Sequence, residues 1–185
     1  MSQSKRLSDV LSVCVILLII LNLVVLPFLP GLVLLGRGGQ PLSALLFYSD
    51  ESLLSPAYFF ALAVVGVWSE PAQAVLTLFL LVCAVCSVII LWQGLMVLQT
   101  VRAGRPFQRS NARSMRRASR CCFVICAMAA VRCVWACLYY RTPAPLFTYN
   151  ALFIPVFLMA GLLCLIIAAL FGQAAALREE NDLTI

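Results

Sequence analysis

Four long apolar runs dominate the chain and predict four membrane-spanning helices. They cover about residues 10–35, 72–98, 121–140 and 151–170. A helix needs about 20 apolar residues to cross roughly 30 Å of hydrocarbon, and each run meets that length. In a bilayer every backbone amide must be satisfied internally, and the alternation of a barrel strand is absent, so these runs are expected to be helices.

Shorter segments separate the runs. We expect an outer loop over 36–71, a basic linker over 101–120 and an acidic tail over 171–185. Within the loop, the apolar stretch 57–68 is too short to cross the hydrocarbon. It is expected to rest on the outer leaflet or over the mouth of the bundle.

The first run has two interpretations. Lys5 and Arg6 precede it, as in a secretory signal peptide, but the run is longer than the usual apolar core and no small-residue cleavage site follows. We therefore expect a retained first helix. Pro27 and Pro30 are expected to kink it, because proline lacks the backbone N–H that continues a helix.

Composition supports one membrane domain. Hydrophobic residues make up 64% of the chain and charged residues 11%, which excludes an ordinary soluble domain. The four spans take about half of the 185 residues, and the segments between them leave no room for a second globular domain. The predicted fold is therefore an all-α, integral membrane four-helix bundle.

The distribution of charge predicts the orientation. Seven arginines lie between Val101 and Cys121, whereas the loop 36–71 has Arg37 against three acidic residues. Basic residues stay cytoplasmic, so both termini and the basic linker are expected in the cytosol.

The linker arginines also share one helical face. At 100° per residue, Arg109, Arg113, Arg116, Arg117 and Arg120 fall within an arc of about 100°, opposite Asn111, Met115, Ala118 and Cys122. This pattern predicts a helix along the inner leaflet that runs into the third span. Anionic headgroups are its expected ligands. No aromatic residues interleave with the arginines, so direct nucleic acid binding is not expected.

Arg132 is the one charge within a predicted span. A charged side chain in the hydrocarbon is costly, so it should face the bundle and hold a partner. Asn22 and Gln93 are the candidate polar partners within the spans. A role in tying helices together and a role in binding an anionic ligand both remain open.

Nine cysteines raise the possibility of a membrane thiol oxidoreductase, with Cys83 and Cys86 in a CxxC spacing. Such an enzyme needs an outward-facing cysteine pair, and neither predicted outer loop, 36–71 or 141–150, contains a cysteine. Cys122, Cys126, Cys133 and Cys137 share one face of the third span, where small residues allow close helix packing. We favour the packing role.

Other catalytic chemistry finds little support. The chain has no histidine, which removes the commonest general base and most zinc sites. We expect no enzyme, cofactor or metal site. A small oligomeric exporter or channel remains an alternative, although no carboxylate for proton coupling lies within a predicted span.

Two motifs resemble a known bacterial family. Gly104, Arg105, Pro106 and Phe107, followed by Asn111, Ala112, Arg113, Met115 and Arg116, are similar to the pattern G-x-P-F-x-x-x-N-A-x-x-L-R. The ending Ala176 to Ile185 resembles the family's L-x-x-E-N-D-L-T-I. The family is that of domain of unknown function 2975, and the likeness extends from about residue 10 to the end.

Two positions depart from the family pattern. Gln108 replaces the usual Ser or Thr after the Pro-Phe pair, and Met115 replaces leucine. We expect Ser110 or Asn111 to take over the helix cap and to shift the helix start by two or three residues.

The resemblance implies a multi-pass protein of the bacterial cytoplasmic membrane. Family members are often encoded beside an Xre-type helix-turn-helix regulator, which implies a regulatory protein with a cytosolic DNA-binding partner. Homo-oligomers are possible. The expected contact residues for a partner or lipid are Arg105, Pro106, Phe107, Asn111, Arg113, Arg116, Arg117, Glu180, Asp182, Leu183 and Ile185. Alternatively, the tail only caps and solvates the last helix.

Overall fold

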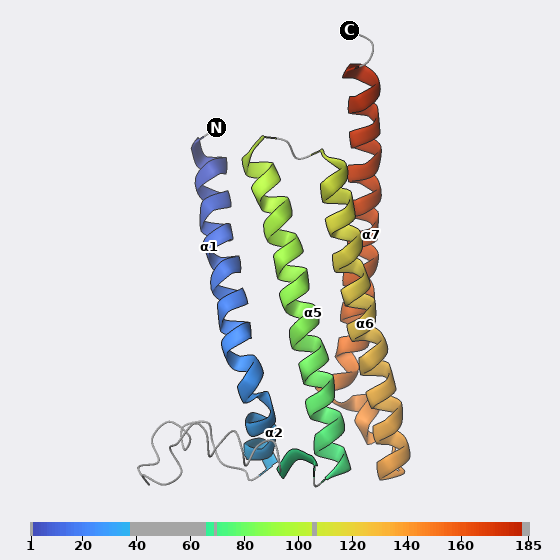
Figure 1. Ribbon diagram of the computed structural model, residues 1–185. Helices are drawn as coiled ribbons and strands as arrows, with labels where there is room; N and C mark the ends of the chain where they lie inside the picture. The colour runs from blue at the N-terminus through green and yellow to red at the C-terminus, as the bar shows by residue number, and fades with distance from the viewer. Residues whose placement is uncertain (1, 38–65, 69, 105–106, 183–185) are drawn as a thin grey trace, which may run out of the picture. The chain divides into compact units, whose positions relative to one another are not determined.

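The described residues form helices joined by turns. The computed structural model describes residues 2–37, 66–68, 70–104 and 107–182. Figure 1 shows the helices α1 (Ser2–Val25), η1 (Leu26–Phe28), α2 (Leu29–Arg37), α5 (Pro71–Arg102), α6 (Arg109–Tyr140), η2 (Ala144–Phe147) and α7 (Tyr149–Asp182).

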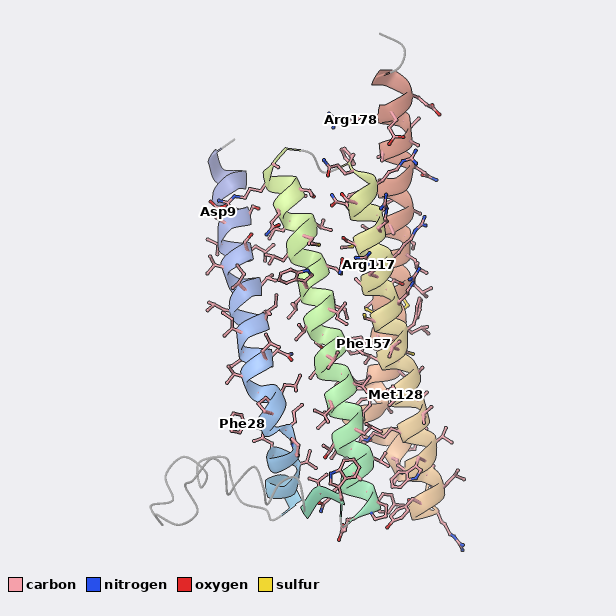
Figure 2. All side chains as sticks on the ribbon, in the orientation of Figure 1. Asp9, Phe28, Arg117, Met128, Phe157 and Arg178 are labelled. Carbon is pink, nitrogen blue, oxygen red and sulfur yellow. The ribbon has the colours of Figure 1, made fainter. Side chains whose placement is uncertain are left out.

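Four helical segments are long and apolar enough to cross a membrane. They are Ser8–Val33, Pro71–Arg102, Arg109–Tyr140 and Ala151–Glu180. The four predicted spans are therefore confirmed, and the chain is a multi-pass membrane protein. Figure 2 shows the mainly carbon-bearing side chains that cover these helices.

The chain divides into two compact units. One joins Met1–Leu21 to Val85–Ile185, and the other is Asn22–Ala84. In the second unit, α1 ends at Val25 and the 3-10 turn η1 places Pro27 near its start before α2 begins. The predicted proline break is confirmed. The apolar stretch 57–68 lies outside the described residues except for 66–68, which are helical.

In the first unit, α6 and α7 form an antiparallel helical hairpin. Arg141 ends α6 in the left-handed region, with φ of 52°, and η2 leads into α7. The two helices lie side by side (Figure 1). Small residues dominate the buried positions. On α6 the buried positions include Ala118, Cys122, Ile125, Ala129 and Cys133, and on α7 Gly161, Ala168 and Ala175 recur every seven residues.

Specific contacts define the register of the hairpin. The Ser119 hydroxyl donates a 2.8 Å hydrogen bond to the carbonyl oxygen of Gly161. Nearer the turn, the Cys126 thiol donates to the carbonyl oxygen of Ile154 at 3.4 Å. Gly161 faces the ring of Phe123 so closely that a Cβ atom would lie 2.9 Å from Cε1. Small residues thus allow the close helix packing.

Three predicted boundaries change. Helix α6 is continuous from Arg109 to Tyr140, because neither glycine nor proline interrupts it. The basic segment therefore continues the axis of the span and does not turn to lie along the membrane surface. Similarly, α5 continues to Arg102, and α7 extends through most of the expected tail to Asp182.

Candidate functional site

The two faces of the first half of α6 differ as predicted. Asn111, Ala118 and Cys122 are at most 3% exposed, and Met115 is half-buried. We call the opposite side the arginine stripe, whose five exposed members are Arg109, Arg113, Arg116, Arg117 and Arg120. In Figure 2, the labels Arg117 and Met128 mark the basic first half and the apolar second half of α6.

Four contacts meet where α5 ends and α6 begins, and we call them the helix-end cluster. Arg102 at the end of α5 forms a 2.9 Å ion pair with Asp9 of α1. The other three contacts join Thr100 to Asn111, Phe107 to Phe171 and Arg109 to Glu179. The cluster thus joins α1, α5, α6 and α7 at one end.

Asn111 is the buried centre of this cluster. Its side chain is 1% exposed, and its Nδ2 donates a 2.6 Å hydrogen bond to the hydroxyl oxygen of Thr100. The Thr100 hydroxyl in turn donates to the carbonyl oxygen of Val97 at 2.7 Å. A buried amide needs such partners, and this chain of bonds ties the start of α6 to the last turns of α5.

Two further contacts join the start of α6 to the far part of α7. The rings of Phe107 and Phe171 meet edge to face, with centroids 6.3 Å apart. Two residues further on, the Arg109 guanidinium pairs with the carboxylate of Glu179. Part of the expected tail is therefore a helix that contacts the start of α6 through Phe107 and Arg109.

Gly104 allows the chain to leave α5. Its φ is +72°, in the region that glycine adopts at little cost, and its N–H donates to the carbonyl oxygen of Val101 at 3.0 Å. After the turn, Gln108 is the N-cap of α6 without a side-chain cap bond. Its backbone carbonyl accepts the N–H of Asn111 at 3.0 Å. The predicted cap shift to Ser110 or Asn111 is wrong, because a backbone bond serves this end.

A pocket of about 440 Å³ adjoins the helix-end cluster. Met96, Gln99, Thr100, Ala103, Gln108, Ser110, Asn111 and Ser114 line it. Six of these residues carry uncharged groups that hydrogen-bond. Its volume lies within the range of pockets for small ligands.

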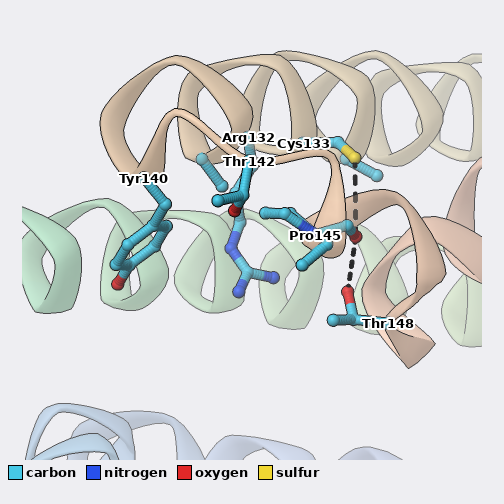
Figure 3. Close-up of a pocket in the computed structure, with 9 residues that line it drawn as sticks. Arg132, Cys133, Tyr140, Thr142, Pro145 and Thr148 are labelled. Atoms are coloured by element: carbon cyan, nitrogen blue, oxygen red, sulfur yellow. Dashed lines mark hydrogen bonds between the residues drawn. The ribbon is translucent and has the colours of Figure 1, made fainter.

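A second pocket, of about 470 Å³, lies beside the turn that joins α6 to α7. Arg132 lies two helical turns before the end of α6 and extends into this pocket between Tyr140 and Pro145 (Figure 3). The hydroxyls of Thr142 and Thr148 also border it. One cation with several hydroxyls and apolar walls suits a small anionic ligand chemically.

The two expected partners of Arg132 belong to different helices, Asn22 to α1 and Gln93 to α5. Gln93, on α5, is 6% exposed, and Asn22 belongs to the other compact unit. Pairing of either with Arg132 stays a prediction. In the tail, Glu180 is exposed and Asp182 ends α7. Arg105, Pro106, Leu183 and Ile185 lie outside the described residues.

All nine cysteines are free thiols. Cys126 and Cys133 donate to carbonyl oxygens of Ile154 and Pro145, across the hairpin. Within the described residues, no group of three or more histidine, cysteine or acidic residues is arranged to hold a metal. These contacts support the packing role of the cysteines.

One family model matches residues 48–185, which include α5, α6 and α7. Its description is protein of unknown function (DUF2975). The chain belongs to this family. The resemblance seen in the two motifs is thus confirmed. All residues of the helix-end cluster except Asp9 lie in the matched range. The family description names no catalytic activity.

No curated protein and no solved structure matches the chain. The helix-end cluster therefore has to be interpreted from its own geometry. Sequence reasoning missed Thr100 and Phe171 as partners of the DUF2975 motif. The signal for Thr100 was a polar pair, Gln99 and Thr100, at the end of an apolar run, but nothing in the sequence linked Phe171 to Phe107.

Proposed function

We propose that this DUF2975 protein is a membrane-anchored regulator that holds a cytosolic DNA-binding protein of the helix-turn-helix class. The class of partner comes from the family resemblance. The observation that carries the proposal is an exposed apolar stripe on α7 that continues past the level of the arginines on α6.

The stripe on α7 is longer than a membrane is thick. Seven large apolar side chains, each more than half exposed, lie on one helical face: Leu152, Val156, Met159, Leu163, Ile166, Leu170 and Leu177. From Leu152 to Leu177 the helix rises about 37 Å, at 1.5 Å per residue. The hydrocarbon core measures roughly 30 Å, so one end of the stripe extends beyond it.

The register of the hairpin indicates which end extends. The bond from Ser119 to Gly161 places the middle of α7 level with Arg116, Arg117 and Arg120. Arginines are costly in hydrocarbon, so this level is expected toward the water side of the span formed by α6. The first charged residue of α7 beyond Gly161 is Arg178, which lies about 25 Å further along the helix.

Four stripe residues lie beyond the level of the arginine stripe, toward the end of α7 at Asp182: Leu163, Ile166, Leu170 and Leu177. Large exposed apolar patches on a protein mark interaction sites. The intervals of three, four and seven suit an amphipathic partner helix laid along α7. This part of α7 is the docking surface of the proposal.

Charge supports a cytosolic position for this surface. Six described arginines of the segment between Val101 and Cys121 lie at the same end, and the Asp9–Arg102 pair brings the start of α1 there as well. Basic segments stay on the cytoplasmic side. A cytosolic regulator could reach α7 only from this side.

Co-purification tests the proposal. The full chain would be co-expressed with an Xre-type helix-turn-helix protein and isolated in detergent, as wild type, as Leu170→Ser/Leu177→Ser and as a chain ending at Ala176. We expect the double variant to lose the partner, because two of its apolar contacts are removed. The shortened chain should recover less partner than wild type, because Leu177 is missing.

A matched control uses an exposed leucine on α6. Leu138 is 73% exposed and lies near the other end of α6, so Leu138→Ser should retain the partner. Equal recovery with every variant would contradict the proposal. A doubled mass without any partner, abolished by Leu170→Ser/Leu177→Ser, would instead assign the stripe to a homo-oligomer.

A further inference from the structure

We propose that the outward face of α6 is a binding site for an anionic phospholipid. The phosphate lies against the arginine stripe, and the acyl chains follow the apolar side chains that continue the stripe. The site is separate from the docking surface on α7 and goes beyond the proposed regulatory function.

The basic and apolar parts share one face of α6. At 100° per residue, the same arc of the helix holds the arginine stripe and four apolar residues, Val124, Val131, Val134 and Leu138. The arginines lie in the first half of α6 and the apolar residues in the second half. All four are exposed, from 46% for Val124 to 73% for Leu138. The helix therefore presents a continuous outward face with charge at one end and hydrocarbon at the other.

The lengths agree with one leaflet. Half of the hydrocarbon core measures about 15 Å, which corresponds to about ten helical residues. Ten residues separate Val124 from Val134. With the phosphate near Arg120, the acyl chains of the same leaflet would lie beside this interval.

The arginines themselves require an anion. Helix α6 contains six arginines and no acidic residue. Arg113 and Arg117, like Arg116 and Arg120, are four residues apart, so their side chains are neighbours and repel one another. A phosphate between two guanidinium groups removes this repulsion and accepts paired hydrogen bonds from each fork.

The described part of the chain does not supply that anion to most of the stripe. Glu179 pairs with Arg109 alone. Among the residues that the structure describes, no acidic side chain pairs with Arg113, Arg116, Arg117 or Arg120. Four exposed guanidinium groups thus remain beside an apolar face, which is the complement of a phospholipid with a net negative charge.

Native mass spectrometry of the full chain tests the site. The protein would be exchanged into mixed micelles with equal dioleoyl phosphatidylglycerol and dioleoyl phosphatidylcholine, and the retained lipids counted. We expect wild type to retain phosphatidylglycerol selectively. Arg116→Gln/Arg117→Gln/Arg120→Gln should weaken that selectivity about 100-fold, since each of the three basic residues contributes about fivefold near the surface.

The matched control, Lys5→Gln/Arg6→Gln/Arg178→Gln, also removes three positive charges. These residues belong to α1 and α7 and not to the arginine stripe of α6. The control should keep most of the selectivity. The triple lysine variant of Arg116, Arg117 and Arg120 should keep part, because charge remains but the planar fork is lost. Equal losses in the glutamine triple and the control would overturn the site, as would a wild type without selectivity.

A last arm separates the lipid from phosphate alone. Inorganic phosphate at millimolar concentration should leave phosphatidylglycerol bound, since it has no acyl chains to contact Val124 and Val131. Complete displacement of phosphatidylglycerol by inorganic phosphate would show that the arginines bind the phosphate group without a contribution from the acyl chains. That result would overturn the lipid assignment.

Discussion

The hydroxyl of Ser119 on α6 donates a hydrogen bond to the backbone carbonyl oxygen of Gly161 on α7, and Ser119 is fully buried at this point. The bond requires the two backbones to approach closely, which Gly161 permits because it has no side chain. Through this register, an apolar part of α7 lies level with the arginine stripe. Four predictions test the packing on which this arrangement depends.

Gly161→Ala is expected to destabilise the hairpin by about 1–3 kcal/mol, because the new Cβ would crowd the ring of Phe123. The measurement is thermal unfolding in detergent. Gly172→Ala on the same helix is the control, since a Cβ there would meet nothing within 4 Å. That variant should be neutral or slightly more stable, because alanine favours helix. Equal destabilisation by both changes would contradict the close approach at Gly161.

Asn111 and Thr100 are expected to be energetically coupled. Asn111→Ala alone should cost about 1–3 kcal/mol, since buried partners lose a hydrogen bond. In a double-mutant cycle with Thr100→Ala, the coupling should be about 0.6 kcal/mol and at most about 1.7 kcal/mol, the range for polar pairs in membrane helices. The free energy of unfolding in detergent would be measured for the wild type, the two single variants and the double variant. Strictly additive losses would show that the bond does not tie α5 to α6.

Gly104→Ala is expected to cost about 1–2 kcal/mol, because a side chain disfavours the left-handed backbone. Gly104→Asn should cost less, since asparagine tolerates that region. The stability of the two variants would be compared in the same detergent. If asparagine were as harmful as alanine, the cause would be something other than the backbone conformation.

The far end of α7 is expected to depend on Phe171 more than on Glu179. The Arg109–Glu179 pair is more than half exposed on both sides, so Glu179→Gln should change stability by less than about 1 kcal/mol. Phe171→Ala removes the edge-to-face contact with Phe107, which contributes about 0.5–1.5 kcal/mol beyond its buried area.

Hydrogen exchange at residues 172–180 separates these two contacts. Amides there should exchange faster in Phe171→Ala and remain protected in Glu179→Gln. Added salt should weaken only the contribution of the ion pair. Faster exchange in Glu179→Gln alone would show that the charge pair, and not the aromatic contact, holds this end of α7.

Periodicity was informative about single helices. The four spans, the break at Pro27 and the two faces of the first half of α6 could be predicted, because each depends on residues close in sequence. The continuity of α6 through Cys121 could also have been read from its uninterrupted composition. The expectation of a surface helix gave too much weight to the change in charge.

Contacts between helices could not be predicted in this way. The register of α6 against α7 depends on the contact of Phe123 with Gly161 and on the hydrogen bond from Ser119 to the Gly161 carbonyl. The periodicity of one helix shows which residues share a face, but not which residues of a neighbouring helix lie at the same level. The same reason explains why Phe171 was missed. The sequence placed Arg132 in a span. That it lies beside the turn after α6 could be seen only in the folded hairpin.

The unbroken course of α6 has a mechanical consequence. The helix carries Arg132 beside the pocket at one end and the arginine stripe at the other, with no proline, glycine or bulge between them to act as a hinge. A rod of this kind cannot absorb a twist locally. If occupancy of the pocket rotates α6 about its axis, the guanidinium groups about 20 Å away must sweep through the same angle.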